Sequence, residues 1–171
     1  SSAASDVYKR QGVIIINGDA GEDHIEVRST TIAVTANGDA GNDYIATSNG
    51  DDNISGGLGD DRINAGAGNN TVWGDIRNNQ ALNEGGNDVI SGGHNGNDTI
   101  CGGPGDDKVY GGGGFDKLYG DGGNDKLDGD KGSDRLEGGD GDDELSGGKG
   151  KDGLLGGGGD DKLLGYKGPD K

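Results

Sequence analysis

The chain has 171 residues, 42 of them glycine, and its formal net charge is −17. Hydrophobic residues make up 27%, less than in an ordinary globular domain, so composition alone favours a disordered chain. The acidic charge argues against nucleic acid and anionic membrane surfaces as partners and favours cations. No apolar run is long enough to span a bilayer, and the longest, Val13 to Ile16, has four residues.

Residues 1–11 share no pattern with the sequence that follows them. We interpret them as the in-frame translation of a sequencing adaptor, not native sequence; the alternative is an ordinary polar tail. The C-terminus stops within a repeat, so we expect a fragment of a longer protein. Residues 12–171 are expected to form one continuous domain.

The β-branched run Val13–Ile16 predicts a first strand, and residues 30–35 predict another. The segments 18–23 and 38–43 are nearly identical glycine- and aspartate-rich turns. Residues 71–84 match the later pattern poorly, and either a degenerate repeat or a surface loop fits them.

From Asp98 to Asp170, every ninth residue is an aspartate, within a unit that reads G-G-x-G-x-D-x-U-x, where U is apolar. Of 15 copies along the chain, all have glycine at position 4 and 14 have aspartate at position 6; the exception is Asn70. A fixed short period is typical of stacked repeats, in which no unit buries its apolar face alone. The spacing excludes collagen, which needs glycine at every third residue.

The first six positions of each unit predict a turn and the last three a short strand, with U facing inward. Two units, 18 residues, then complete one coil with a strand on each side and a turn at each edge. The predicted fold is therefore an all-β solenoid with two short parallel sheets. The aspartates alternate between its edges, with Asp98, Asp116, Asp134, Asp152 and Asp170 on one and Asp107, Asp125, Asp143 and Asp161 on the other.

Stacked turns lie about 4.8 Å apart, close enough for carboxylates without cations to repel each other. A calcium ion between turns would take carboxylates and several backbone carbonyls as ligands, whereas Mg²⁺ demands a tighter octahedron. The candidate metal ligands are Asp23, Asp43, Asp52, Asp61, Asp88, Asp98, Asp107, Asp116, Asp125, Asp134, Asp143, Asp152 and Asp161.

The sequence gives little support for zinc binding or catalysis. Neither His24 nor His94 has the Cys/His neighbours of a zinc site, and no catalytic motif is present, so no enzyme activity is expected of this segment. Cys101 is expected to be an incidental exposed thiol. Trp73 either packs against a coil edge or marks a binding patch, and packing is the favoured interpretation.

The copies at 102–110, 138–146, 147–155 and 156–164 make the chain resemble the RTX (hemolysin-type) family of calcium-binding nonapeptide repeats, over about residues 18–170. The resemblance implies a right-handed parallel β-roll, export by a type I secretion system, and calcium-triggered folding outside the cell. The chain departs from the family motif at Asn70, which should weaken one site. It also departs at Asp121 and Asp130, which replace the second glycine of the motif. The resemblance also implies carbonyl ligands from motif positions 1–4, among them Gly102, Gly105, Gly111, Gly114, Gly120, Gly123, Gly129, Gly132, Gly138, Gly141, Gly147, Gly150, Gly156 and Gly159.

Two functions remain open at this point. The segment is either a calcium-dependent structural module of a large secreted protein, such as an adhesin, toxin or surface protein, or the C-terminal calcium roll of a secreted enzyme such as a metalloprotease or lipase. The number of copies favours the structural module.

Overall fold

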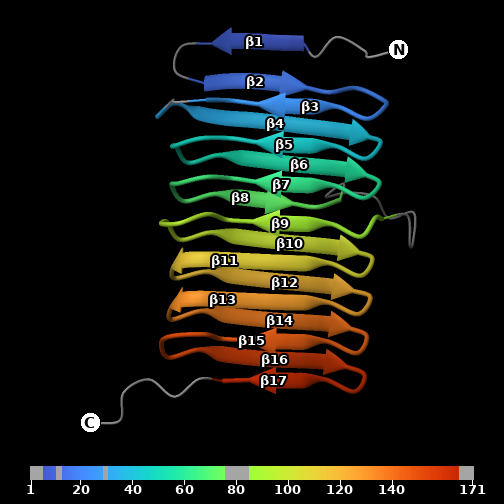
Figure 1. The fold of residues 1–171 in the computed structure, drawn as a ribbon, viewed down its shortest axis with the longest axis vertical. Helices are drawn as coiled ribbons and strands as arrows, with labels where there is room; N and C mark the ends of the chain where they lie inside the picture. The colour runs from blue at the N-terminus through green and yellow to red at the C-terminus, as the bar shows by residue number, and fades with distance from the viewer. Residues whose placement is uncertain (1–5, 11–12, 29–30, 76–84, 166–171) are drawn as a thin grey trace.

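The computed structural model describes residues 13–28, 31–75 and 85–165, together with the backbone of residues 6–10. These residues form two stacked β-sheets, and from β2 on successive strands alternate between them. The colour gradient in Figure 1 shows that the strands follow the chain order down the stack. None of the described segments is a helix of the length and hydropathy that crossing a bilayer requires.

The nine-stranded sheet contains, in spatial order, β1 (Asp6–Arg10), β2 (Val13–Asn17), β4 (Ala33–Ala40), β6 (Asn53–Leu58), β8 (Thr71–Trp73), β10 (Thr99–Pro104), β12 (Lys117–Gly122), β14 (Arg135–Asp140) and β16 (Gly153–Gly158). The eight-stranded sheet contains β3 (His24–Glu26), β5 (Tyr44–Ala46), β7 (Arg62–Asn64), β9 (Val89–Ser91), β11 (Lys108–Gly114), β13 (Lys126–Gly132), β15 (Glu144–Ser146) and β17 (Lys162–Leu164). Apart from β1, every paired strand of the described residues runs parallel to its neighbours.

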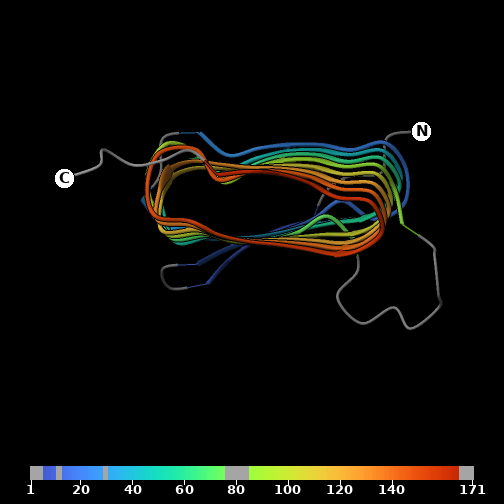
Figure 2. The same cartoon turned by 90° about the horizontal axis from the view of Figure 1, so that it is seen from below.

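The register confirms the predicted coil of 18 residues. Leu118 of β12 pairs with Leu136 of β14, and Val109 of β11 pairs with Leu127 of β13. Seen along the stack, the coils superimpose as a flattened ring whose long sides are the two sheets (Figure 2). The turns at the two narrow ends are thereby stacked into two separate edges.

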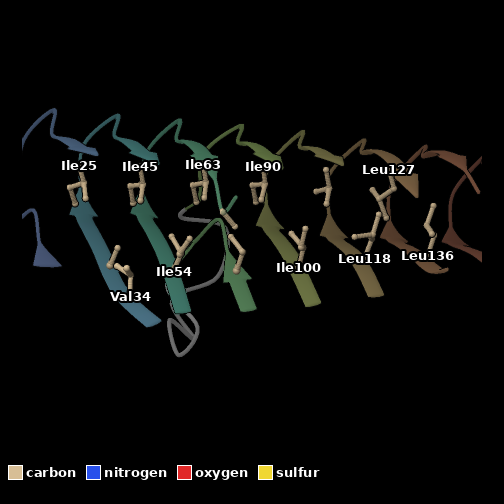
Figure 3. Packing of buried hydrophobic residues seen from close by; sticks show 14 of the residues in the cluster. Ile25, Val34, Ile45, Ile54, Ile63, Ile90, Ile100, Leu118, Leu127 and Leu136 are labelled. Carbon is tan, nitrogen blue, oxygen red and sulfur yellow. The ribbon is translucent and has the colours of Figure 1, made fainter. Parts of the chain in front are cut away.

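The apolar residue of each unit points inward, as predicted from the alternation of side chains along a strand. Figure 3 shows the two facing rows, in which Ile45, Ile63 and Ile90 come from one sheet and Ile54 and Ile100 from the other. All five are at most 2% exposed. The core is one side chain deep from each sheet, so burial contributes only about 1.5–3 kcal/mol per large residue.

Such a thin core leaves the order of the glycine-rich turns dependent on other interactions. On the outer face these include ion pairs from Lys126 and Lys162 to Glu144, with N–O distances of 3.5 and 2.7 Å. They lie at the surface, where such pairs contribute little. The stabilisation of the turns must come from their own polar groups.

The N-terminal strands differ in part from the expectation. The predicted strand at Val13–Ile16 is confirmed as β2, but the one expected over 30–35 begins at Ala33 and continues to Ala40. The backbone of residues 6–10, which precede the predicted domain of residues 12–171, forms β1 and pairs antiparallel with β2. The adaptor origin of residues 1–11 stays a prediction.

The described residues around segment 71–84 account for its poor match. Residues 71–73 form β8 in regular register with β6 and β10, while β7 pairs directly with β9. The Asp88 carboxylate accepts a hydrogen bond from the N–H of Asp61, 27 residues earlier, whereas the equivalent hydrogen bonds of the neighbouring turns on this edge span 18 to 20 residues. On the other edge, the hydrogen bond from Asn70 to Asp98 spans 28 residues. The extra residues therefore fall within one turn, between Asp75 and Gly85. Residues 76–84 themselves lie outside the described part of the chain. We call residues 74–75 and 85–88 the split turn.

Candidate metal centre

From Asp43 on, the side chain at position 6 of each turn accepts a hydrogen bond from a backbone N–H of the preceding coil. The N–H of Asp107 donates to Oδ1 of Asp125, and the N–H of Asp125 donates to Oδ1 of Asp143, both at 2.8 Å. Because the donor and the acceptor occupy the same position in successive coils, the aspartates form continuous columns. Hydrogen bonds to a charged acceptor of this kind contribute about 1.5–3 kcal/mol.

There are two columns, one on each edge, as the spacing predicts. The first leads into the eight-stranded sheet and contains Asp23, Asp43, Asp61, Asp88, Asp107, Asp125, Asp143 and Asp161. The second leads into the nine-stranded sheet and contains Asp52, Asn70, Asp98, Asp116, Asp134 and Asp152. Asp170 lies outside the described residues.

The second carboxylate oxygen of these aspartates, apart from Asp161, is buried and has no hydrogen-bond partner within the protein. Buried polar atoms are nearly always partnered, so a regular series of exceptions calls for a missing partner. The buried Oδ2 atoms without a partner belong to Asp23, Asp43, Asp52, Asp61, Asp75, Asp88, Asp98, Asp107, Asp116, Asp125, Asp134, Asp143 and Asp152.

A glycine leaves room beside most of these atoms, at position 1 of the turn; the turn of Asp52 has Thr47 at that position. A Cβ added to Gly38 would collide with Oδ2 of Asp43 and with the carbonyl oxygen of Gly56 in the next coil. Gly120 faces Asp125 and Gly138 in the same way. Carboxylate and carbonyl oxygens from two coils therefore converge where the glycine has no side chain.

Without a cation this arrangement penalises the ionised carboxylates. Loss of hydration raises the pKa of Asp61 and Asp107 to about 8, although each also accepts a backbone hydrogen bond that lowers it. Loss of hydration likewise raises the pKa of Asp88 and Asp125 to about 7, and that of Asp134 to about 6. A bound cation would remove this penalty by supplying the missing partner.

The donor set fits a hard cation. Among the described residues, no three histidine, cysteine, aspartate or glutamate side chains gather at one point, so carbonyl oxygens would supply much of a coordination shell. A shell of carboxylates and carbonyls suits calcium, and its lack of nitrogen and sulfur ligands does not suit zinc.

Asn70 shows what happens when the carboxylate is absent. Its Oδ1 accepts from the N–H of Asp52 at 3.0 Å, so the column continues. Its Nδ2 donates to the carbonyls of Gly68 and Gly92, at 3.3 and 3.2 Å. The amide thus occupies the place of the unpartnered Oδ2 and donates to two backbone carbonyls. The expectation that Asn70 weakens its site stays a prediction, now with a geometric reason.

The remaining residues considered in the sequence analysis lie either on the surface of the sheets or in the turns. His24 stacks on Tyr44 with ring centroids 4.6 Å apart, on the outer face of the eight-stranded sheet. Cys101 is half-buried, not exposed as expected. Asp121 and Asp130 accept positive φ values of 77° and 63° in place of glycine. Asp152 and Asp161, near the last coil, are half-buried, while their Oδ1 atoms keep the column.

Sequence reasoning missed a second set of inter-coil hydrogen bonds, made by position 5. The N–H of Asn124 donates to Oδ1 of Asp106 at 2.7 Å, and the N–H of Asp142 donates to Oδ1 of Asn124 at 2.9 Å. These side chains are exposed and connect coils in the direction opposite to the position-6 column. The frequent Asp or Asn at position 5 was the available signal.

The family comparison bears on this geometry directly. The profile of the RTX calcium-binding nonapeptide repeat (4 copies) matches residues 37–72, 47–80, 84–109, 102–136, 128–163 and 137–171. No curated protein matches the chain. Because these matches cover well over half of its length, the chain belongs to the RTX calcium-binding nonapeptide repeat family.

Proposed function

We propose that this chain is a calcium-binding module that folds when calcium binds, as a structural part of a larger exported protein. The observation that carries the proposal is the regular series of buried Oδ2 atoms without partners. In the metal-free chain the burial and mutual repulsion of these carboxylates destabilise the folded state. A calcium ion coordinated between two coils would neutralise their charge and stabilise the stack.

Binding and folding are therefore one process. Each site is built from two coils, so an ion that binds orders its neighbours and prepares the next site. Individual sites of extracellular modules bind calcium with dissociation constants of about 10⁻⁴–10⁻³ M. A stack of such sites should respond to calcium over a narrow concentration range.

The first prediction concerns calcium addition to the chelated chain. Far-UV circular dichroism should show little β-structure without calcium and a steep, cooperative rise as calcium is added. Magnesium at the same concentrations serves as the control and should produce a much smaller change. A signal that stays flat up to about 10 mM calcium, above the affinities of extracellular modules, would contradict the proposal.

The second prediction concerns Asn70→Asp. The substitution replaces the Nδ2 donor with a carboxylate oxygen facing the Gly68 and Gly92 carbonyls. We expect one additional calcium ion per chain and a lower melting temperature of any metal-free folded state. Asn97→Asp adds the same charge at an exposed position and should leave the count unchanged. Isothermal titration calorimetry measures the stoichiometry, and an unchanged count for Asn70→Asp would refute the prediction.

Type I secretion and an extracellular location are part of the proposal and rest on the family, whose members are typically exported bacterial proteins. The high calcium of the extracellular medium would then act as the folding signal. The alternative is that the parent protein is a secreted enzyme and this segment is its calcium roll. Both parent proteins would contain the same repeats, so the repeats do not distinguish them. The coding sequence upstream decides between them, because a zincin or serine-hydrolase motif there would identify the enzyme.

A further inference from the structure

Asp75 differs from the other aspartates at motif position 2. In four turns this position carries an aspartate with positive φ whose side chain is exposed or half-buried: Asp19, Asp39, Asp121 and Asp130. Asp75 is only 6% exposed. The repeat pattern therefore does not account for its burial.

The split turn directs this side chain inward. The N–H of Gly86, on the far side of this turn, donates to Oδ1 of Asp75 at 3.4 Å. The N–H of Asp75 donates to the carbonyl of Gly102 in the following coil, at 3.3 Å. Oδ2 of Asp75 is buried and has no partner.

The surroundings of this oxygen resemble those of the position-6 carboxylates. A Cβ added to Gly85 would collide with Oδ2 of Asp75 and with the carbonyl oxygen of Pro104. In the same turn, a Cβ added to Gly74 would collide with Oδ2 of Asp88 and with the carbonyl oxygen of Gly102. The split turn thus directs two unpartnered carboxylate oxygens at carbonyls of the next coil.

We propose that Asp75 is a ligand of a cation site that the nine-residue repeat does not generate, formed between the split turn and residues 102–104. The inference rests on the proposed calcium binding of the repeats and adds a site to it. Asp75 Oδ2 and the Pro104 carbonyl hold the ion, and Asp88 supplies the neighbouring negative charge. The split turn holds two buried, unpartnered carboxylates where a regular turn holds one. The added negative charge strengthens the attraction for a cation, so this site fills before those of the regular turns.

Charge and access support this assignment. Asp75 lines a hollow of about 760 Å³ together with Asp121 and Asp140, so an ion reaches the site through an acidic opening. Burial and the nearby Asp88 raise the pKa of Asp75 to about 7. Trp73, the single tryptophan of the chain, lines the same hollow.

That tryptophan provides a direct probe. Terbium(III) is a hard, oxygen-seeking ion that occupies calcium sites and emits when a nearby tryptophan transfers energy to it. Excitation at the red edge of the tryptophan band, where tyrosine does not absorb, selects ions close to Trp73. The full chain in calcium-free buffer should give sensitised emission at the lowest terbium concentrations.

The deciding comparison uses Asp75→Asn. This variant should lose the early phase and require at least tenfold more terbium for half-maximal emission. Asp130→Asn, an exposed aspartate at the same motif position, should match the parent chain. Circular dichroism at saturating calcium checks the fold, and Asp75→Gly, which restores the residue of the repeat, provides a second variant that the turn accepts.

The possible results are distinct. An early phase that persists unchanged in both Asp75 variants overturns the inference while leaving the proposed function intact. A parent chain whose circular dichroism responds neither to calcium nor to terbium overturns the proposed function itself. Loss of the early phase in both Asp75 variants, but not in Asp130→Asn, supports the site.

Discussion

Replacing Asp125 and Asp143 together by alanine will raise the calcium concentration needed for folding several-fold and lower the cooperativity of the transition. The two residues are consecutive rungs of one column and are each 2% exposed. The change removes two candidate ligands and also leaves the N–H groups of Asp107 and Asp125 without acceptors, at about 1–3 kcal/mol each. Circular dichroism during calcium titration measures both the midpoint and the steepness.

Two controls separate the causes. Asp125→Asn with Asp143→Asn keeps an oxygen acceptor for each N–H, as Asn70 does for Asp52, but removes the charge. It should still raise the midpoint if the carboxylates bind calcium. Glu22→Ala with Asp160→Ala removes two exposed carboxylates and should leave the midpoint where it was. A midpoint that is the same in all three variants would exclude Asp125 and Asp143 as ligands.

The regular part of this structure can be predicted from the sequence because every nine-residue unit repeats the same pattern of glycine, aspartate and apolar residues. The inward apolar residue, the glycine-rich turn and the alternation of edges are all set within nine residues. Leu118 and Leu136 therefore stack where the 18-residue coil places them. The predicted columns of aspartates follow from the same register.

What could not be predicted depends on the three-dimensional path of individual turns. The spacing of 18 residues between Asn70 and Asp88 fits a degenerate repeat as well as an insertion, and only the pairing of β7 with β9 places the extra residues in one turn. The burial of Asp75 is a consequence of that turn. The sequence also does not show that the two oxygens of each carboxylate differ. Only the structure shows that Oδ1 accepts a hydrogen bond from a backbone N–H while Oδ2 has no partner.

The columns also explain why the chain should fold through cations. Backbone hydrogen bonds fix each carboxylate on one side, so it cannot turn outward to recover its hydration without breaking the inter-coil contact. The same residue therefore both connects two coils and carries the charge that separates them. Whether the stack forms depends on what neutralises that charge, and protons can do so as well as calcium.

Acidification will accordingly promote folding of the calcium-free chain. Burial raises the pKa of Asp61 and Asp107 to about 8, of Asp98 and Asp125 to about 7, and of Asp134 to about 6, whereas the unfolded values are about 3.9. A raised folded-state pKa means that the folded chain binds more protons. The stability that these groups contribute is complete below about pH 4 and is lost as the pH rises through about 6 to 8, at about 1.4 kcal/mol for each unit of pKa difference.

The measurement is circular dichroism of the metal-free chain between about pH 5 and pH 8, with light scattering to exclude aggregation as the net charge falls. β-Structure should increase toward the acidic end without calcium. With calcium the dependence should reverse, because protons compete for the same oxygens: the folding midpoint should fall as the pH rises, and binding should release protons into a weakly buffered solution. A calcium midpoint independent of pH across this window would mean that the buried carboxylates are not the groups that calcium neutralises.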